Sequence, residues 1–157
     1  MSGLCEAELD FLTVQGDPQV VKAAVEGRGK SSTKILAVTF LTSLDRTDLD
    51  QNLIKRGEIQ ALASSRAEKA ILAGADGIIA SPKELPFLRK NPLCVTKIIV
   101  TPGIRLANST VNDQKRVATP FEALKLGASY IVVGRPICQA NDPLSVYKEI
   151  KKEISHL

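Results

Sequence analysis

The chain has 157 residues, of which 44% are apolar and 24% are charged, a composition typical of one globular domain with a substantial core. Its apolar runs are far too short to cross a bilayer, and its first residues lack the basic and apolar regions of a signal peptide, so we expect a cytoplasmic protein that does not bind membranes. The net charge of +4 is scattered and aromatic residues make up only 4%, which argues against nucleic-acid binding.

Three cysteines and one histidine limit the chemistry that the chain can perform. Cys5, Cys94 and Cys138 are widely spaced and form no C-x-x-C pair, so we expect reduced, mostly buried thiols. His156 stands next to the C-terminus, where we expect a solvated tail residue. Catalysis by histidine and a metal site are therefore not expected.

Five short apolar runs are predicted to be β-strands. Most of them are continuous rather than alternating, which is typical of strands that are covered on both faces. In chain order they are Phe11–Val14, Ile35–Leu41, Gly77–Ala80, Lys97–Val100 and Tyr130–Val133.

Stretches with helical spacing lie between these strands, and three of them open at a proline, which is favoured in the first turn of a helix. These three begin at Asp17-Pro18, Thr119-Pro120 and Asp142-Pro143. A fourth stretch runs from Ile59 to Ile71, and residues 2–9 are predicted to be part of a further helix.

The joints between helix and strand repeat along the chain. A glycine ends the helix before the third strand at Gly74 and again before the fifth strand at Gly127. This is the repeat of a parallel βα protein, and its spacing predicts a (β/α)₈ TIM barrel. Such barrels need eight strands and about 250 residues. We therefore interpret residues 1–157 as a single incomplete TIM-barrel domain that holds the last five βα units.

Two arginines follow predicted strands, at the end of a parallel barrel where active sites lie. Arg105 ends the sequence T-P-G-I-R after the fourth strand, and Gly134-Arg135 follows the fifth. A glycine there lets backbone N–H groups approach an anion, and an arginine adds a forked donor. Gln114 lies between the two arginines in sequence. The alternative is that Gly134-Arg135 forms a tight turn with a surface arginine.

The order of these sequence motifs resembles orotidine 5′-monophosphate decarboxylase of the common bacterial type. The resemblance covers T-P-G-I-R at 101–105, D-Q-x-R at 113–116, T-P at 119–120 and G-R-P-I at 134–137. It extends to A-V-T-x-L-T-S at 37–43 and to the strand F-L-T-V at 11–14, and so to nearly the whole chain.

The resemblance implies roles for five residues. Thr42 would face the orotate ring or its ribose side, whereas Arg105, Gln114, Gly134 and Arg135 would bind the 5′-phosphate. It also implies a reaction without metal or cofactor, and a homodimeric enzyme. Two arginines match a phosphate dianion, and a glutamine can donate to the phosphate and to the base.

The sequence departs from the family pattern in three places. Gln15 stands where the family usually has histidine, and Leu106 where it usually has proline. The third departure is larger, because the family's catalytic D-x-K-x-x-D motif occurs nowhere in the 157 residues. Asp76 precedes its strand, so we expect it to lie at the opposite, stabilising end of the barrel.

These observations lead to one hypothesis and two alternatives. The chain is expected to be a decarboxylase of pyrimidine biosynthesis, acting on orotidine 5′-monophosphate, shortened at its front and inactive by itself, with no catalytic residue of its own. One alternative is a non-catalytic half-barrel that binds nucleotides or phosphorylated metabolites, including an inactive gene remnant. The other is a related sugar-phosphate enzyme such as hexulose-phosphate synthase. In each case, the exposed edges of the first and last strands favour association.

Overall fold

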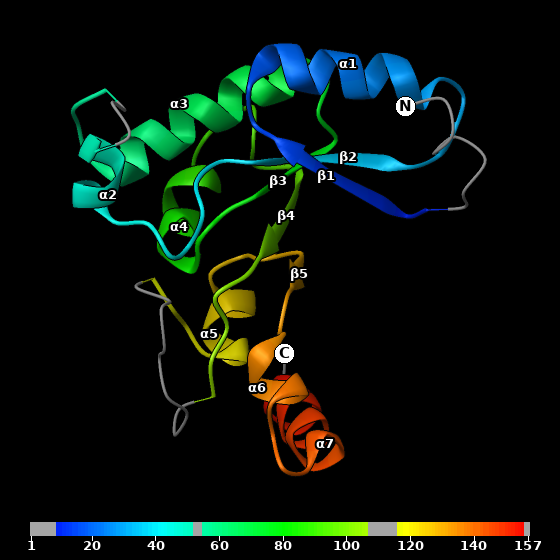
Figure 1. The fold of residues 1–157 in the computed structure, drawn as a ribbon, viewed down its shortest axis with the longest axis vertical. Coiled ribbons are helices and arrows are strands. Elements are labelled where there is room, and N and C mark those ends of the chain that lie inside the picture. The colour runs from blue at the N-terminus through cyan, green and yellow to red at the C-terminus, as the bar shows by residue number, and fades with distance from the viewer. Residues whose placement is uncertain (1–8, 52–54, 107–115, 156–157) are drawn as a thin grey trace.

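Five parallel strands form one sheet, and their order across the sheet is their order along the chain (Figure 1). The computed structural model describes residues 9–51, 55–106 and 116–155. The strands are β1 (Phe11–Gln15), β2 (Lys34–Val38), β3 (Gly77–Ile79), β4 (Ile98–Thr101) and β5 (Tyr130–Ile131). Helical segments connect each strand to the next, so the structure is an α/β fold that holds five βα units of a TIM-barrel-like architecture.

The helices begin where the sequence places helix starts. Proline occupies the first turn of the three helices that follow Asp17, Thr119 and Asp142. The side chains of Thr119 and Asp142 also accept a hydrogen bond from a backbone N–H in that first turn. The helices are α1 (Pro18–Arg28), α2 (Arg46–Gln51), α3 (Ile59–Leu72), the 3₁₀ helix η2 (Pro82–Glu84), α4 (Leu85–Leu88), α5 (Pro120–Lys125), α6 (Arg135–Cys138) and α7 (Pro143–Ile154).

Glycine provides the turn from helix to strand at both predicted joints. Gly74 after α3 has φ 105°, and Gly127 after α5 has φ 104°, a region of backbone conformation that other residues rarely adopt. The repeated joint is thus confirmed, and it brings each chain segment back toward the start of the next strand.

One face of the sheet packs against the helices, and the opposite face is open at its edges. Ala37, Ile78 and Ile99 lie in register and belong to a buried cluster that includes residues of α1 and α3. On β1 and β5, Phe11 and Tyr130 remain 38% and 52% exposed. Their rings nevertheless meet edge to face, with centroids 5.4 Å apart, so the sheet curls far enough for its two edge strands to approach.

The amino ends of the strands are tied together by two charged groups. The Asp76 carboxylate accepts from Arg28 at 2.5 Å and from the backbone N–H of Ile35 at 2.8 Å, which joins the end of α1 to β2 and β3. The Arg89 guanidinium donates to the Gly127 carbonyl at 2.8 Å and to the Ser129 hydroxyl at 3.1 Å. Asp76 therefore lies at the stabilising end, as predicted.

Two strands are shorter than predicted, and four short helices are additional to the predicted elements. The predicted strands 35–41 and 130–133 end earlier, at Val38 and Ile131. The short helices α2, η2, α4 and α6 had not been predicted, because one or two turns show no clear periodicity.

The thiol prediction holds for one described cysteine and is wrong for the other. Cys94 is buried, but Cys138 is exposed at the end of α6, a helix of four residues none of which is buried. Burial also raises the pKa of the Cys94 thiol. Cys5, His156 and the helix predicted at residues 2–8 lie outside the described residues.

Membrane insertion finds no support in the helices of the described chain. Among residues 9–51, 55–106 and 116–155, no helix has both the length and the apolar character required to span a bilayer.

Candidate functional site

The loops that follow β2, β3, β4 and β5 leave the same edge of the sheet, because all the strands run parallel. We call this edge the carboxyl-end face and define it by five residues that follow these strands. Each comes from a loop or from the start of a helix. They are Thr42, Glu84, Arg105, Gly134 and Arg135.

Arg105 follows β4 and is buried more deeply than a surface arginine would be. Its side chain is 7% exposed and donates to the Ile104 carbonyl at 2.8 Å. Its backbone N–H donates to the Ala118 carbonyl at 3.0 Å, next to the parallel bridge between Ile104 and Ala118. Residues 104–105 are therefore hydrogen-bonded to residue 118, which holds the two ends of the segment 106–117 together.

Gly134 and Arg135 follow β5, the strand next to β4. Gly134 is the N-terminal cap of α6, and a Cβ placed on it would meet no atom within 4 Å. The neighbouring Arg135 is partly exposed. This open approach to the start of α6, with an arginine beside it, suits an anion better than it suits a packed turn.

The structure places the other predicted site residues differently. Thr42 follows β2 and is 6% exposed; β3 separates its strand from β4. Gln114 lies outside the described residues. The predicted residues thus fall into two groups, with Arg105, Gly134 and Arg135 after adjacent strands and Thr42 two strands from β4.

A buried ion pair at this face was missed in the sequence analysis. Arg116 contacts the carboxylate of Glu84 through one guanidinium nitrogen, and the two side chains are only 7% and 1% exposed. The other terminal nitrogen of Arg116 donates to the Leu41 carbonyl at 2.8 Å. One side chain therefore joins the loops that follow β2 and β3.

Glu84 is held by further donors from the same two loops. Its Oε2 atom accepts from the backbone N–H of Ser81 at 3.0 Å and from the Thr39 hydroxyl at 3.3 Å. Ser81 and Glu84 form a capping box at the start of η2. The sequence S-x-x-E could have predicted that local box, but it carries no sign of Arg116.

Burial sets the electrostatic character of this pair. Removal of Glu84 from solvent raises the pKa of its carboxyl, and this effect outweighs the opposing influence of Arg116 and of the Ser81 N–H. A carboxylate in such surroundings needs its partner, because an unpaired buried charge is strongly unfavourable.

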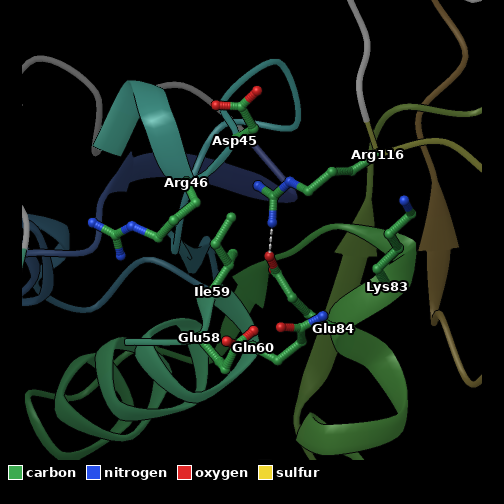
Figure 2. Close-up of a pocket in the computed structure, with 8 residues that line it drawn as sticks. All are labelled: Asp45, Arg46, Glu58, Ile59, Gln60, Lys83, Glu84 and Arg116. Carbon is green, nitrogen blue, oxygen red and sulfur yellow. Dashed lines mark hydrogen bonds and ion pairs between the residues drawn. The ribbon is translucent and has the colours of Figure 1, made fainter. Parts of the chain in front are cut away.

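A cavity of about 300 Å³ opens beside the ion pair (Figure 2). Figure 2 shows the side chains of Glu84 and Arg116 pointing toward one another, whereas Arg46 points away from them. The cavity combines three carboxylates with three cationic side chains. It is lined by Asp45, Arg46, Glu58, Ile59, Gln60, Lys83, Glu84 and Arg116.

The donor set at the carboxyl-end face is suited to anion binding. Within the part of the chain that the structure describes, no group of three or more His, Cys, Asp or Glu side chains could hold a metal ion. The arginines after β4 and β5, together with the open start of α6, supply guanidinium and backbone donors for a phosphate group.

Known proteins resemble this chain over almost all of its length. Residues 2–150 match the family described as Orotidine 5′-phosphate decarboxylase / HUMPS. An orotidine 5′-phosphate decarboxylase from Cereibacter sphaeroides is 51% identical over 152 residues, which cover 97% of this chain and 66% of that protein. The enzyme of the same name from Jannaschia sp. is 57% identical over 141 residues, which cover 90% and 62%.

A solved structure shows the same likeness in three dimensions. The crystal structure of orotidine 5′-phosphate decarboxylase from Lactobacillus acidophilus matches with a TM-score of 0.77 and 37% identity, over 98% of this chain and 67% of that one. The chain spans 62–66% of the length of the two curated relatives above. On the family match and these identities, the chain belongs to the orotidine 5′-phosphate decarboxylase / HUMPS family.

Proposed function

We propose that this chain carries the phosphate-binding part of an orotidine 5′-monophosphate decarboxylase, the enzyme that forms uridine 5′-monophosphate (UMP) in pyrimidine biosynthesis. One observation carries the proposal: Arg105 and Gly134-Arg135 follow adjacent parallel strands in a chain of this family. Loops after neighbouring strands of a barrel are a recurrent place for phosphate binding.

The site is assigned in two parts. Arg105, Gln114, Gly134 and Arg135 bind the 5′-phosphate, and Thr42 faces the base or the ribose. Support comes from the deep burial of Arg105, which limits its motion, and from the open space at Gly134. A guanidinium held in place loses little freedom when it binds a dianion.

The domain is proposed to be an incomplete barrel made of the last five βα units. Its support is the sequential strand order with β1 and β5 at the edges, together with the greater length of the relatives. Two free edges favour pairing between copies or with another chain, so a homodimer or an edge-paired assembly is expected. Light scattering measures the oligomeric state, and denaturant unfolding measures cooperativity. A stable monomer with one cooperative unfolding transition would contradict this arrangement.

Decarboxylation by the isolated chain is not expected. The 157 residues contain no D-x-K-x-x-D motif, and the reaction leaves negative charge on a carbon, which must be stabilised by positioned charges. A spectrophotometric assay of the purified chain with orotidine 5′-monophosphate should show no turnover. Measurable turnover would favour a complete active site, whereas recovery of activity on adding the other βα units would support a divided enzyme.

Two alternatives remain distinct from this proposal. A non-catalytic nucleotide-binding half-barrel would bind UMP but gain no activity from added βα units. A sugar-phosphate enzyme such as hexulose-phosphate synthase would bind ribulose 5-phosphate better than UMP. The sequence A-V-T-x-L-T-S at 37–43, which holds Thr42, and the segment that holds Gln114 support the nucleotide enzyme over the sugar-phosphate enzyme.

Ligand titration tests the assigned site. UMP should bind weakly and uridine more weakly still, because the phosphate supplies most of the contacts in this part of the barrel. Arg135→Ala should weaken UMP binding by about tenfold, the effect of losing a hydrogen bond to a charged group. Lys30→Ala is the matched control, since Lys30 is an exposed cation in the turn between α1 and β2, at the amino ends of the strands. Equal UMP affinity in wild type and Arg135→Ala would overturn the assignment.

A further inference from the structure

The Glu84–Arg116 pair connects the ends of three consecutive strands. Arg116 contacts the carbonyl of Leu41 after β2 and the carboxylate of Glu84 after β3. Two residues later, Ala118 pairs with Ile104 and accepts the N–H of Arg105 after β4. The loop after β2 is thereby connected through one buried side chain to the loop that carries Arg105.

The two loops joined in this way hold residues assigned to different parts of the substrate. Thr42 directly follows Leu41, whose carbonyl is the acceptor, and Arg105 directly follows Ile104. Residues 39–42 and residues 104–105 follow β2 and β4, which make no pairing with each other because β3 lies between them. Their relative position therefore depends on contacts made beyond the strand ends.

We infer that the Glu84–Arg116 pair is a positioning element, which holds the Thr42 loop and the Arg105 loop at the separation that a 5′-nucleotide requires. The inference rests on the proposed function for its ligand, and adds two residues that do not themselves contact that ligand. The physical reason is geometric: a planar guanidinium with donors in fixed directions sets both the distance and the angle between its two acceptors.

Stability alone gives a weak reason for such a pair. A buried pair of opposite charges is often no more stabilising than apolar side chains of similar volume, whereas it does fix one arrangement of its neighbours. Glu84 accepts from donors in three segments, which follow β2, β3 and β4, as expected for a group that orients what it touches.

The first test follows the loops themselves, without a ligand. In Glu84→Gln, which keeps the size and the acceptor oxygen, hydrogen–deuterium exchange should become faster in peptides that cover residues 39–44 and 98–106. Asp76→Asn is the matched control, because it breaks another ion pair between an arginine and a carboxylate, at the opposite end of the strands. Its effect should stay near residues 33–36 and 76. Unchanged exchange of both loops in Glu84→Gln would overturn the inference.

The second test asks whether the positioning matters for binding. Glu84→Gln and Arg116→Lys should each weaken UMP binding by about tenfold, a typical coupling between residues of one network. Asp76→Asn should leave UMP affinity unchanged even where its loss of stability is equal. A merely structural role would make Asp76→Asn and Glu84→Gln weaken binding alike at matched stability, and that result would contradict the inference.

A double-mutant cycle connects the pair to the phosphate group. If Glu84 acts through the position of Arg105, Glu84→Gln should cost no further UMP affinity once Arg105 is replaced by alanine. Fully additive losses would mean that Glu84 acts on binding by another route. A wild-type chain that binds no UMP would overturn the proposed function and the nucleotide part of this inference, while the exchange experiment would still decide whether the pair holds the two loops.

Discussion

The two ends of the sheet hold their charged side chains in different ways. At the amino ends, Arg89 donates to four backbone carbonyls and the Ser129 hydroxyl, and the Arg28–Asp76 pair is partly exposed. At the carboxyl-end face, Glu84 and Arg116 neutralise each other in almost complete burial. Neutral carbonyls can accept hydrogen bonds from a guanidinium without the desolvation of a second charge. The contacts at the amino ends therefore carry a smaller desolvation free energy. The costly arrangement thus lies at the face where we propose that the nucleotide binds.

The largest expected effect comes from removing one member of the buried pair. Arg116→Ala leaves Glu84 without its cation and should lower the free energy of unfolding by about 3–5 kcal/mol at neutral pH. Asp76→Asn should cost only about 1 kcal/mol, because both side chains of the Arg28–Asp76 pair are reached by water. Urea unfolding of the two variants would measure the difference. Similar losses would remove the contrast between the two ends of the sheet.

Two glycines give a second comparison of the same ends. A Cβ on Gly77, at the start of β3, would lie 2.4 Å from the Ile98 carbonyl oxygen, whereas a Cβ on Gly134 would meet nothing within 4 Å. Gly77→Ala should therefore destabilise the chain by about 1–3 kcal/mol. Gly134→Ala should change stability by less than about 0.5 kcal/mol.

In UMP binding, the order should be reversed: Gly134→Ala should lower the affinity more than Gly77→Ala does. Gly134→Ala places a methyl group in the open approach to α6 and is expected to weaken binding about tenfold. Thermal unfolding and UMP titration on both variants would test this. Equal affinity of Gly134→Ala and wild type would show that the ligand does not approach the backbone there.

The smallest expected effect is a pH dependence that comes from Glu84. Its pKa in the folded chain is raised above the ordinary value of 4.5 by burial, so the folded state holds the proton more tightly than the unfolded state. The contribution of this group to stability is then fully present below the unfolded pKa, and is lost as pH rises through the folded pKa.

Comparison with Glu84→Gln isolates that group, because all other titrations are shared. The stability of wild type relative to Glu84→Gln should decrease as pH rises from about 4.5, the ordinary pKa of a glutamate side chain. Denaturant unfolding of both proteins between acidic and neutral pH would measure it. A relative stability that increases with pH would mean that Arg116, rather than burial, controls the pKa of the Glu84 carboxyl.

The fold could be predicted from sequence because its signals are local. Continuous apolar runs gave all five strands, and the dipeptides Asp17-Pro18 and Asp142-Pro143 gave two helix starts within a residue. Gly74 and Gly127 gave the joints, since each adopts a backbone conformation that favours glycine. Strand ends were less certain, because pairing beyond Ile131 depends on neighbours that the local sequence does not encode.

The candidate site was predicted only in part. Arg105 and Gly134-Arg135 lie after β4 and β5 as predicted, because the apolar pattern already marks those strands. Glu84 and Arg116 were missed because they are 32 residues apart, and neither charge differs in its local sequence from a solvated surface residue. The burial of Arg105 was not predicted either, because the adjacent bridge joins Ile104 to Ala118, which is distant in sequence.

The sequential order of the strands has a consequence for how the chain folds during synthesis. Each strand pairs with the one made just before it, so no strand has to be inserted between two that have already paired. Pairing between neighbours in sequence closes segments of about 20–40 residues, which costs less chain entropy than pairing strands that lie farther apart. As the chain leaves the ribosome, the sheet can therefore grow one βα unit at a time, and each new strand covers the edge left open by the strand before it.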